Sequence, residues 1–142
     1  MLKKFFSGLR VNLERVSVVG STNDIATLIS RLMHPSGYGF LVIRLNEQDD
    51  FIQCSGDPKG IQVNIPLITP RQIELESKIH IAINVLGLQL SETKGSDGSR
   101  FLDININGEA PQVSIIMQSL VYEVFGVTSS NKLRFDGELI VA

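Results

Sequence analysis

The sequence predicts an α+β fold in which an antiparallel meander sheet has helices packed on one side. Residues 39–66 hold three short apolar-rich runs separated by two polar turns, a pattern typical of a three-strand meander. Helical periodicity precedes and follows this stretch, and a further alternating run lies between the last two helical patterns. The expected order of elements is therefore α-(α)-β-β-β-α-β-α.

Length and composition indicate one globular unit. The chain has 142 residues, which suits a single core, so residues 1–142 are expected to form one domain with an N-terminal helical segment at 1–20 and a C-terminal tail at 128–142. The net charge of −2 does not favour nucleic acid as a partner. Cys54 is the only cysteine, which excludes an intrachain disulfide, and its place on an apolar strand predicts a buried thiol.

The N-terminal segment is predicted to be an amphipathic helix. Its apolar residues recur at helical spacing, and the segment is locally basic. Such a helix could pack on the core, lie on a membrane surface or form part of a partner-binding face. Phe5, Phe6 and Leu9 are its candidate partner-binding residues. The apolar stripe consists of Leu2, Phe5, Phe6, Leu9, Leu13 and Val16.

The central elements follow from capping and turn signals. The polar run 21–24 begins a second helix, which ends before Pro35 because the residue before a proline avoids the helical region. Strands are expected at 40–45, 51–55 and 61–65.

The third of these strands alternates between apolar and amide side chains, so one of its faces is expected to be buried and the other amide-rich. The sequence leaves open which face of the sheet the helices cover. Ile61, Val63 and Ile65 are therefore candidate partner-binding residues that could equally belong to the core.

The second half of the chain is expected to continue with a helix from Arg71 to Leu86, capped by Gly87. A flexible loop at 93–99 precedes a fourth strand at 102–106. Pro111 suits the first turn of a last helix, which Gly126 closes, and the tail from 133 to 141 has weak strand character.

No group of residues supports a reaction, so no catalytic, cofactor-binding or metal-binding residue is predicted, and the protein is not expected to be an enzyme. His80 lies four residues after Glu76, a spacing that predicts a surface hydrogen bond. The run Gly95–Gly98 lies between a helix and a strand, the wrong context for a phosphate loop. The turn carboxylates are expected to serve turn formation and solubility; they are Asp49, Asp50 and Asp57.

No apolar run reaches the roughly 18 residues that a transmembrane helix needs. The N-terminus is too short and interrupted in its apolar part for a signal peptide. With a single cysteine, these features predict a cytoplasmic protein with no transmembrane segment. No nucleic-acid partner is expected, because the meander has only Arg44 and Lys59 where a basic stripe would be needed.

Four short motifs resemble a known family. They are Phe40–Ile43 in the first meander strand, Phe51–Gly56 in the second, Leu86-Gly87-Leu88 at the end of a helix and Ser119–Val127 at the end of the last helix. This set, over residues 22–127, resembles the TY-Chap domain, a YbjN-like relative of type III secretion chaperones. Leu88 stands where many members of that family have tryptophan.

The resemblance implies a secretion-chaperone-like fold and a non-enzymatic protein-binding module, chaperone-like or adaptor. Such a module holds a client protein or peptide on exposed apolar surface, and a homodimer is expected. The alternative is a small-molecule sensor or regulatory domain with a pocket between sheet and helices. Neither reading implies a cofactor.

Overall fold

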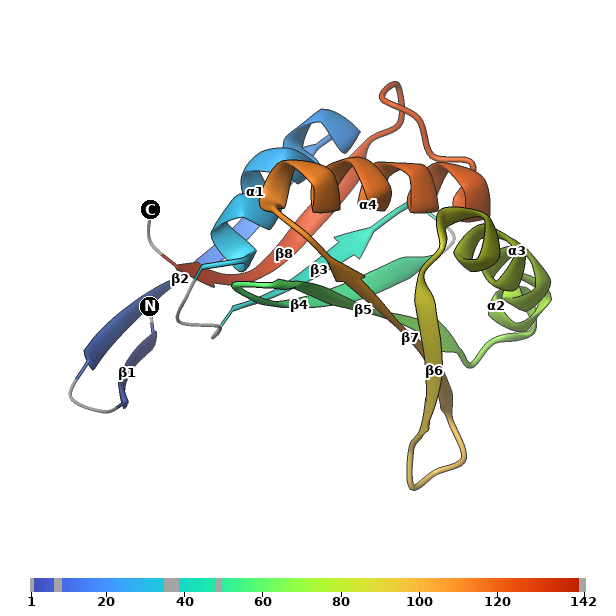
Figure 1. The fold of residues 1–142 in the computed structure, drawn as a ribbon, viewed down its shortest axis with the longest axis horizontal. Coiled ribbons are helices and arrows are strands. Elements are labelled where there is room, and N and C mark those ends of the chain that lie inside the picture. Colours follow the sequence, from blue (N-terminus) through green and yellow to red (C-terminus); the bar gives the residue numbers. More distant parts are fainter. Residues whose placement is uncertain (1, 7–8, 35–38, 48–49, 141–142) are drawn as a thin grey trace.

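The protein contains an antiparallel sheet with the strand order β1-β2-β8-β3-β4-β5-β7-β6 (Figure 1). The computed structural model describes residues 2–6, 9–34, 39–47 and 50–140, without the side chains of residues 2–6, 9–12, 57 and 140. The strands are β1 (Leu2–Phe6), β2 (Leu9–Gly20), β3 (Phe40–Arg44), β4 (Phe51–Asp57), β5 (Gly60–Leu67), β6 (Gln89–Lys94), β7 (Arg100–Asn107) and β8 (Leu133–Ile140).

The helices lie over one face of this sheet. Helix α4 crosses the sheet with α1 on one side and α3 on the other, and α2 adjoins α3 (Figure 1). The other face of the sheet carries no helix of the described residues. The helical elements are η1 (Thr22–Asp24), α1 (Ile25–Leu32), α2 (Pro70–Glu74), α3 (Glu76–Leu86) and α4 (Ala110–Phe125).

Local signals define these elements much as the sequence predicts. The Ser21 hydroxyl accepts a hydrogen bond from Asn23 N–H, and Asp24 bonds back to Ser21 N–H, so a capping box precedes α1. Gly87 and Gly126 end α3 and α4 with φ of 68° and 70°, the left-handed conformation that favours glycine. The mixed α+β architecture with an antiparallel sheet is confirmed.

The prediction of an N-terminal helix is wrong. Residues 2–6 and 9–20 form the antiparallel strands β1 and β2, with Phe5 opposite Arg10 and Phe6 opposite Leu9. Leu9, Val11 and Leu13 also alternate with polar residues at a period of two, and the valine-rich run that follows favours strands. Residues 13–20 then pair with eight positions of β8, and these hydrogen bonds stabilise the strand rather than a helix.

Three later expectations also need correction. The predicted loop at 93–99 begins inside strand β6, which pairs with β7 along Gln89–Lys94. The single helix expected at 71–86 is two helices that meet at Leu75, whose N–H bonds to the Gln72 carbonyl in a tight turn.

The C-terminal tail is a central strand: β8 lies between β2 and β3 and joins the N-terminal ribbon to the rest of the sheet. The backbones of β8 and β3 approach closely at Gly137, and a glycine is needed there because an added Cβ would lie 2.2 Å from the Phe40 carbonyl oxygen.

The core fills the space between the helices and the covered sheet face. Its buried members come from helices α1, α3 and α4, from strands β2, β3, β4, β5, β7 and β8 and from adjoining loops, and most of them are less than 5% exposed. Among the side chains that the structure describes, the largest fully buried one is Phe135 of β8.

Cys54 belongs to this core, as the sequence predicts, with 1% of its surface exposed. Burial in apolar surroundings raises the pKa of the thiol to about 12. Because the thiolate is the reactive form, we expect a disulfide reagent such as DTNB to leave Cys54 unlabelled in the native protein at pH 8 and to label it fully in 6 M guanidinium chloride. Rapid labelling of the native protein would contradict this burial.

Candidate partner-binding surfaces

Of the six residues predicted to bind a partner, three are buried and three have side chains outside the described part of the chain. Ile61, Val63 and Ile65 are 4%, 0% and 2% exposed and pack beneath the helices, so they belong to the core and offer nothing to a partner. The side chains of Phe5, Phe6 and Leu9 lie outside the described part of the chain, although their backbone is placed in β1 and β2.

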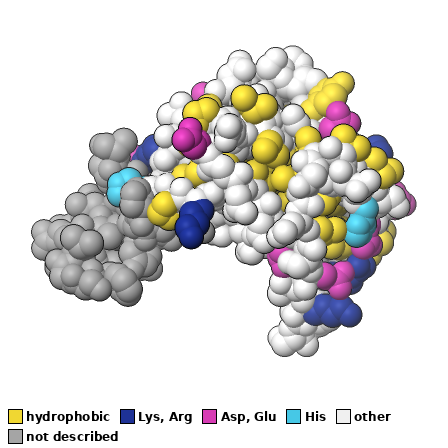
Figure 2. Space-filling view, in the orientation of Figure 1, with side chains coloured by type: hydrophobic (Ala, Val, Ile, Leu, Met, Phe, Trp, Pro, Cys, Tyr) yellow, Lys and Arg dark blue, Asp and Glu magenta, His cyan; other side chains and the backbone are white. Residues whose placement is uncertain are grey.

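Exposed apolar side chains gather instead on the outer surface of the helix layer. Ile81 and Val85 on α3 are 65% and 76% exposed, and Ile115 and Tyr122 on α4 are 66% and 55% exposed. Figure 2 shows hydrophobic side chains on this side of the molecule, over α4 and toward α3. We call these four residues the helix patch.

A groove of about 290 Å³ lies within the helix patch, between α3 and α4. Ser119 and Glu123 face it from α4, and Ile115 and Tyr122 lie about one turn from Ser119 on the same helix surface. The groove lining therefore combines apolar side chains with one basic and one acidic side chain. It is lined by Lys78, Ile81, Ala82, Val85, Leu86, Ser119 and Glu123.

The uncovered sheet face is divided into two halves by its cross-strand pairs. On β6, β7, β5 and β4, opposite residues form two polar rows, as the amide-rich face of the third meander strand predicts. Asn64 donates to Asp103 at 2.5 Å, and the Thr93 hydroxyl donates to the other oxygen of Asp103. The rows are Gln89–Asn105–Gln62–Ser55 and Ser91–Asp103–Asn64–Gln53.

The other half, on β3, β8 and β2, carries charged and apolar side chains around a depression of about 660 Å³. Arg44 of β3 lies directly opposite Arg134 of β8. Asp136 forms ion pairs with both, at 3.6 Å and 3.2 Å, and Ser17 donates to it at 2.7 Å. The Ser17 hydrogen bond and the two guanidinium groups lower the pKa of Asp136. We call this half the arginine face.

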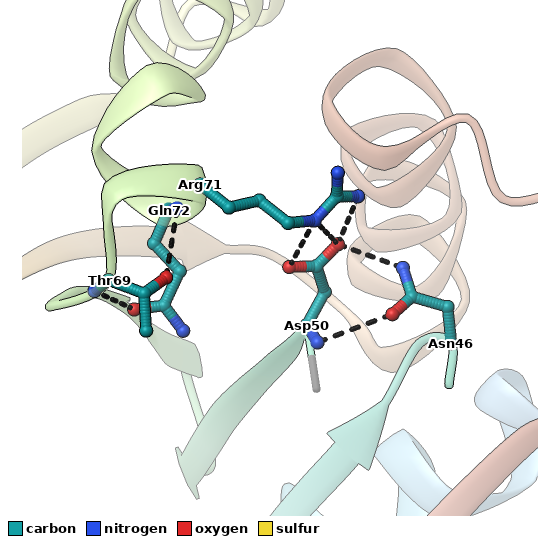
Figure 3. Close-up of polar contacts among 5 residues, drawn as sticks. All are labelled: Asn46, Asp50, Thr69, Arg71 and Gln72. Atoms are coloured by element: carbon teal, nitrogen blue, oxygen red, sulfur yellow. Dashed lines mark hydrogen bonds and ion pairs between the residues drawn. The ribbon is translucent and has the colours of Figure 1, made fainter. Parts of the chain in front are cut away.

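A buried carboxylate anchors the β3–β4 connection to α2 (Figure 3). The Asp50 side chain is 1% exposed and accepts hydrogen bonds from Arg71 Nε and from an Arg71 terminal nitrogen, the latter at 2.8 Å. Asn46 donates to the same carboxylate at 2.8 Å. The Asp50 contact raises the pKa of Arg71. Asp50 thus does more than the turn formation expected of it.

The start of α2 is held by a second set of bonds near this cluster (Figure 3). The Thr69 hydroxyl accepts from Gln72 N–H at 3.2 Å, and the Gln72 side-chain oxygen accepts from Thr69 N–H at 3.0 Å. This capping box fixes α2 just after β5 and places Arg71 over Asp50. The cluster is a structural clamp, because its carboxylate is closed off from solvent.

The predicted contact between Glu76 and His80 is present, at 3.6 Å on the surface. Glu76 also pairs with Arg100 at 2.8 Å, and Arg100 in turn pairs with Glu92 of β6. The Arg100 hydrogen bond is the main cause of the lowered pKa of Glu76. These residues tie α3 to the β6–β7 hairpin.

No group of three or more His, Cys, Asp or Glu side chains within 2–6, 9–34, 39–47 and 50–140 is placed to hold a metal ion. No helix in this part of the chain is long and apolar enough to cross a membrane.

Comparison of the chain with family models, with curated proteins and with solved structures finds no match. Functional interpretation therefore depends on the surfaces themselves.

Proposed function

We propose that the protein is a non-enzymatic protein-binding module, chaperone-like or adaptor, that holds a client polypeptide on the helix patch. The observation that carries this proposal is the exposure of four large apolar side chains, each more than half exposed, on neighbouring turns of α3 and α4. Contiguous exposed apolar surface on a folded protein marks sites that bind proteins, membranes or ligands.

The groove supports a polypeptide as the occupant. An amphipathic segment can place apolar side chains at one-turn spacing into a groove between two helices. Lys78 and Glu123 in the groove lining would accommodate the polar edges of such a segment without selecting for one charge. The family resemblance of the sequence motifs implies the same kind of function and a secretion-chaperone-like fold.

The test is binding of an uncharged, fluorescein-labelled peptide rich in Leu and Phe, measured by anisotropy. We expect the combined substitutions Ile81→Ser and Val85→Ser to weaken binding about tenfold or more, because buried apolar anchors each contribute on the order of 1–2 kcal/mol to an interface. Unfolding midpoints should change little, since both side chains are already exposed in the free protein.

A matched control separates the patch from general surface apolarity. Ile68 and Ile73 are 53% and 46% exposed and lie just after β5 and on α2, outside the groove. The pair Ile68→Ser and Ile73→Ser should leave the peptide affinity unchanged. If the native protein does not bind the peptide, or if both pairs of substitutions weaken binding equally, the helix patch is not the client site.

The expected homodimer remains part of this proposal, and light scattering coupled to size-exclusion chromatography measures it directly. A protein that is monomeric at every concentration and binds no peptide would count against the chaperone-like function. The alternative, a sensor with a pocket between sheet and helices, has less support because apolar side chains fill that space. A melting shift caused by a small ligand would revive it.

A further inference from the structure

The arginine face carries an unusual pairing of like charges. Arg44 and Arg134 are directly opposite each other on adjacent strands, an arrangement that is destabilising unless an anion compensates it. Asp136 is the carboxylate placed between them, and it also serves Ser17. One carboxylate thus serves two guanidinium groups.

Most donors of Arg15 and Arg44 are unused, whereas Arg134 already donates through Nε to Asp136 and through a terminal nitrogen to Ser17. Arg44 forms an ion pair with Asp136 at 3.6 Å but donates no hydrogen bond to that carboxylate or to any other group within the described part of the chain. Arg15 of β2 lies opposite Glu138 of β8 and makes no ion pair with any described residue. A guanidinium has five N–H donors in a planar fork that matches a carboxylate. The arginine face therefore has free capacity for an anionic group.

An apolar surface adjoins these donors. Phe40 is 49% exposed and Val42 is half-buried, and both line the 660 Å³ depression with the three arginines. Val42 lies directly opposite Asp136, and Phe40 opposite Glu138. A ligand that combines a carboxylate with an apolar side chain would match both components.

A second depression, of about 440 Å³, shares Arg44 and Arg134 with the first and continues to Asn131 and Lys132. The two together form a surface that extends along β3 and β8 and covers a ligand from one side only. Small molecules are usually enclosed over most of their surface, whereas an extended polypeptide can use an open face. The lining cations are Arg15, Arg44, Lys132 and Arg134, and the lining anions are Glu47, Asp136 and Glu138.

We propose that the arginine face binds an acidic polypeptide segment, with client carboxylates on Arg44 and Arg134 and an adjoining apolar side chain on Phe40 and Val42. This inference rests on the proposed protein-binding function and adds a second surface with its own selectivity. The helix patch holds apolar sequence, and the arginine face selects clients that carry Asp or Glu beside an apolar residue.

Two labelled peptides of equal length test the proposal. One contains Asp and Glu interspersed with Leu and Phe, and the other has Asn and Gln at the same positions. We expect the native protein to bind the acidic peptide at least about tenfold more tightly, with an affinity that falls as salt rises. Equal affinity for the two peptides, or no binding of the acidic peptide at low salt, would overturn the proposal.

Substitutions locate the binding surface. The pair Arg44→Gln and Arg134→Gln should weaken acidic-peptide binding about tenfold or more. The matched pair Lys59→Gln and Lys94→Gln removes the same charge from exposed residues outside both depressions and should have little effect. An equal loss from both pairs would indicate attraction by overall charge and would reject a site.

A third variant changes affinity in the opposite direction. Asp136→Asn removes the carboxylate that competes with the client while keeping a side chain that can bond Ser17, so binding of the acidic peptide should tighten several-fold. A weaker affinity in a folded Asp136→Asn protein would show that Asp136 is needed for another reason. This variant also decides the matter should the double arginine variant fail to fold.

The two proposals fail separately. Ile81→Ser with Val85→Ser should leave the acidic-peptide affinity unchanged, because these residues lie on the opposite side of the sheet from Arg44. Loss of uncharged-peptide binding with intact acidic-peptide selectivity supports both surfaces. If the acidic peptide does not bind while the uncharged peptide does, only the arginine face is rejected.

Discussion

Phe135→Ala is expected to lower the free energy of unfolding by about 3–5 kcal/mol, the usual cost of deleting a fully buried aromatic side chain. Phe135 is 0% exposed and is the largest fully buried side chain among those that the structure describes. It lies opposite Ile43 on β3 and opposite Val18 on β2, so its ring packs at the centre of the sheet. Urea unfolding followed by circular dichroism measures the effect.

The position of β8 makes this loss larger than an ordinary core substitution. β8 is the strand that connects β2 with β3, so a weakened β8 also loosens the N-terminal ribbon. Val19→Ala is the control: this side chain on the neighbouring strand is 68% exposed, and its truncation should cost less than about 0.5 kcal/mol. A loss below about 1 kcal/mol for Phe135→Ala would contradict the central place of β8.

The sequence predicts elements whose signals are local. The helix begun by Ser21, the three meander strands, the strand around Ile104 and the last helix with its glycine cap all depend on periodicity, turns or caps within a few residues. The role of β8 is different, because its partners on β2 lie more than a hundred positions away; Ser17 and Asp136 are separated by 119 residues. Weak strand character in a tail gives no indication that the tail completes the sheet.

The N-terminal error has a related cause. Apolar residues in this segment fit both a helical stripe and, from Leu9 to Leu13, a strict alternation with polar residues. Periodicity alone therefore could not decide, and the pairing available from β8 determines the outcome. The N-terminal segment thus forms a strand and not a helix because β8, from the other end of the chain, supplies its hydrogen-bond partners.

The candidate surfaces were only partly predictable. The amide-rich face was visible in the alternation of Gln62 and Asn64, whereas the core role of Ile61, Val63 and Ile65 depends on which face the helices cover. The helix patch did have a signal, because Ile81 and Val85 are apolar residues that do not belong to the buried stripe of α3. The pairing of Arg44 with Arg134 had no signal in the sequence, because it depends on the register of β3 and β8.

The second large effect is expected at the clamp between Asp50 and Arg71. Arg71→Ala should destabilise the protein by about 1–3 kcal/mol, because it leaves a buried carboxylate with Asn46 as its remaining side-chain donor among the described residues. This expected loss of stability is smaller than the 3–5 kcal/mol typical of breaking a fully buried ion pair, because the Arg71 side chain is 50% exposed and its charge is screened by solvent. Thermal and urea unfolding measure the loss.

A double-mutant cycle distinguishes loss of the clamp from loss of packing. Asp50→Ala alone also removes a buried hydrogen-bond acceptor of Asn46, so it should cost as much as Arg71→Ala or more. With both residues changed, no unpaired buried charge remains, and the combined loss should be clearly smaller than the sum of the two single losses. Strict additivity would show that Asp50 and Arg71 stabilise the fold independently. A strong coupling instead means that the ion pair itself holds α2 against the β3–β4 connection, and with it the start of the helical segment that leads into Ile81 and Val85.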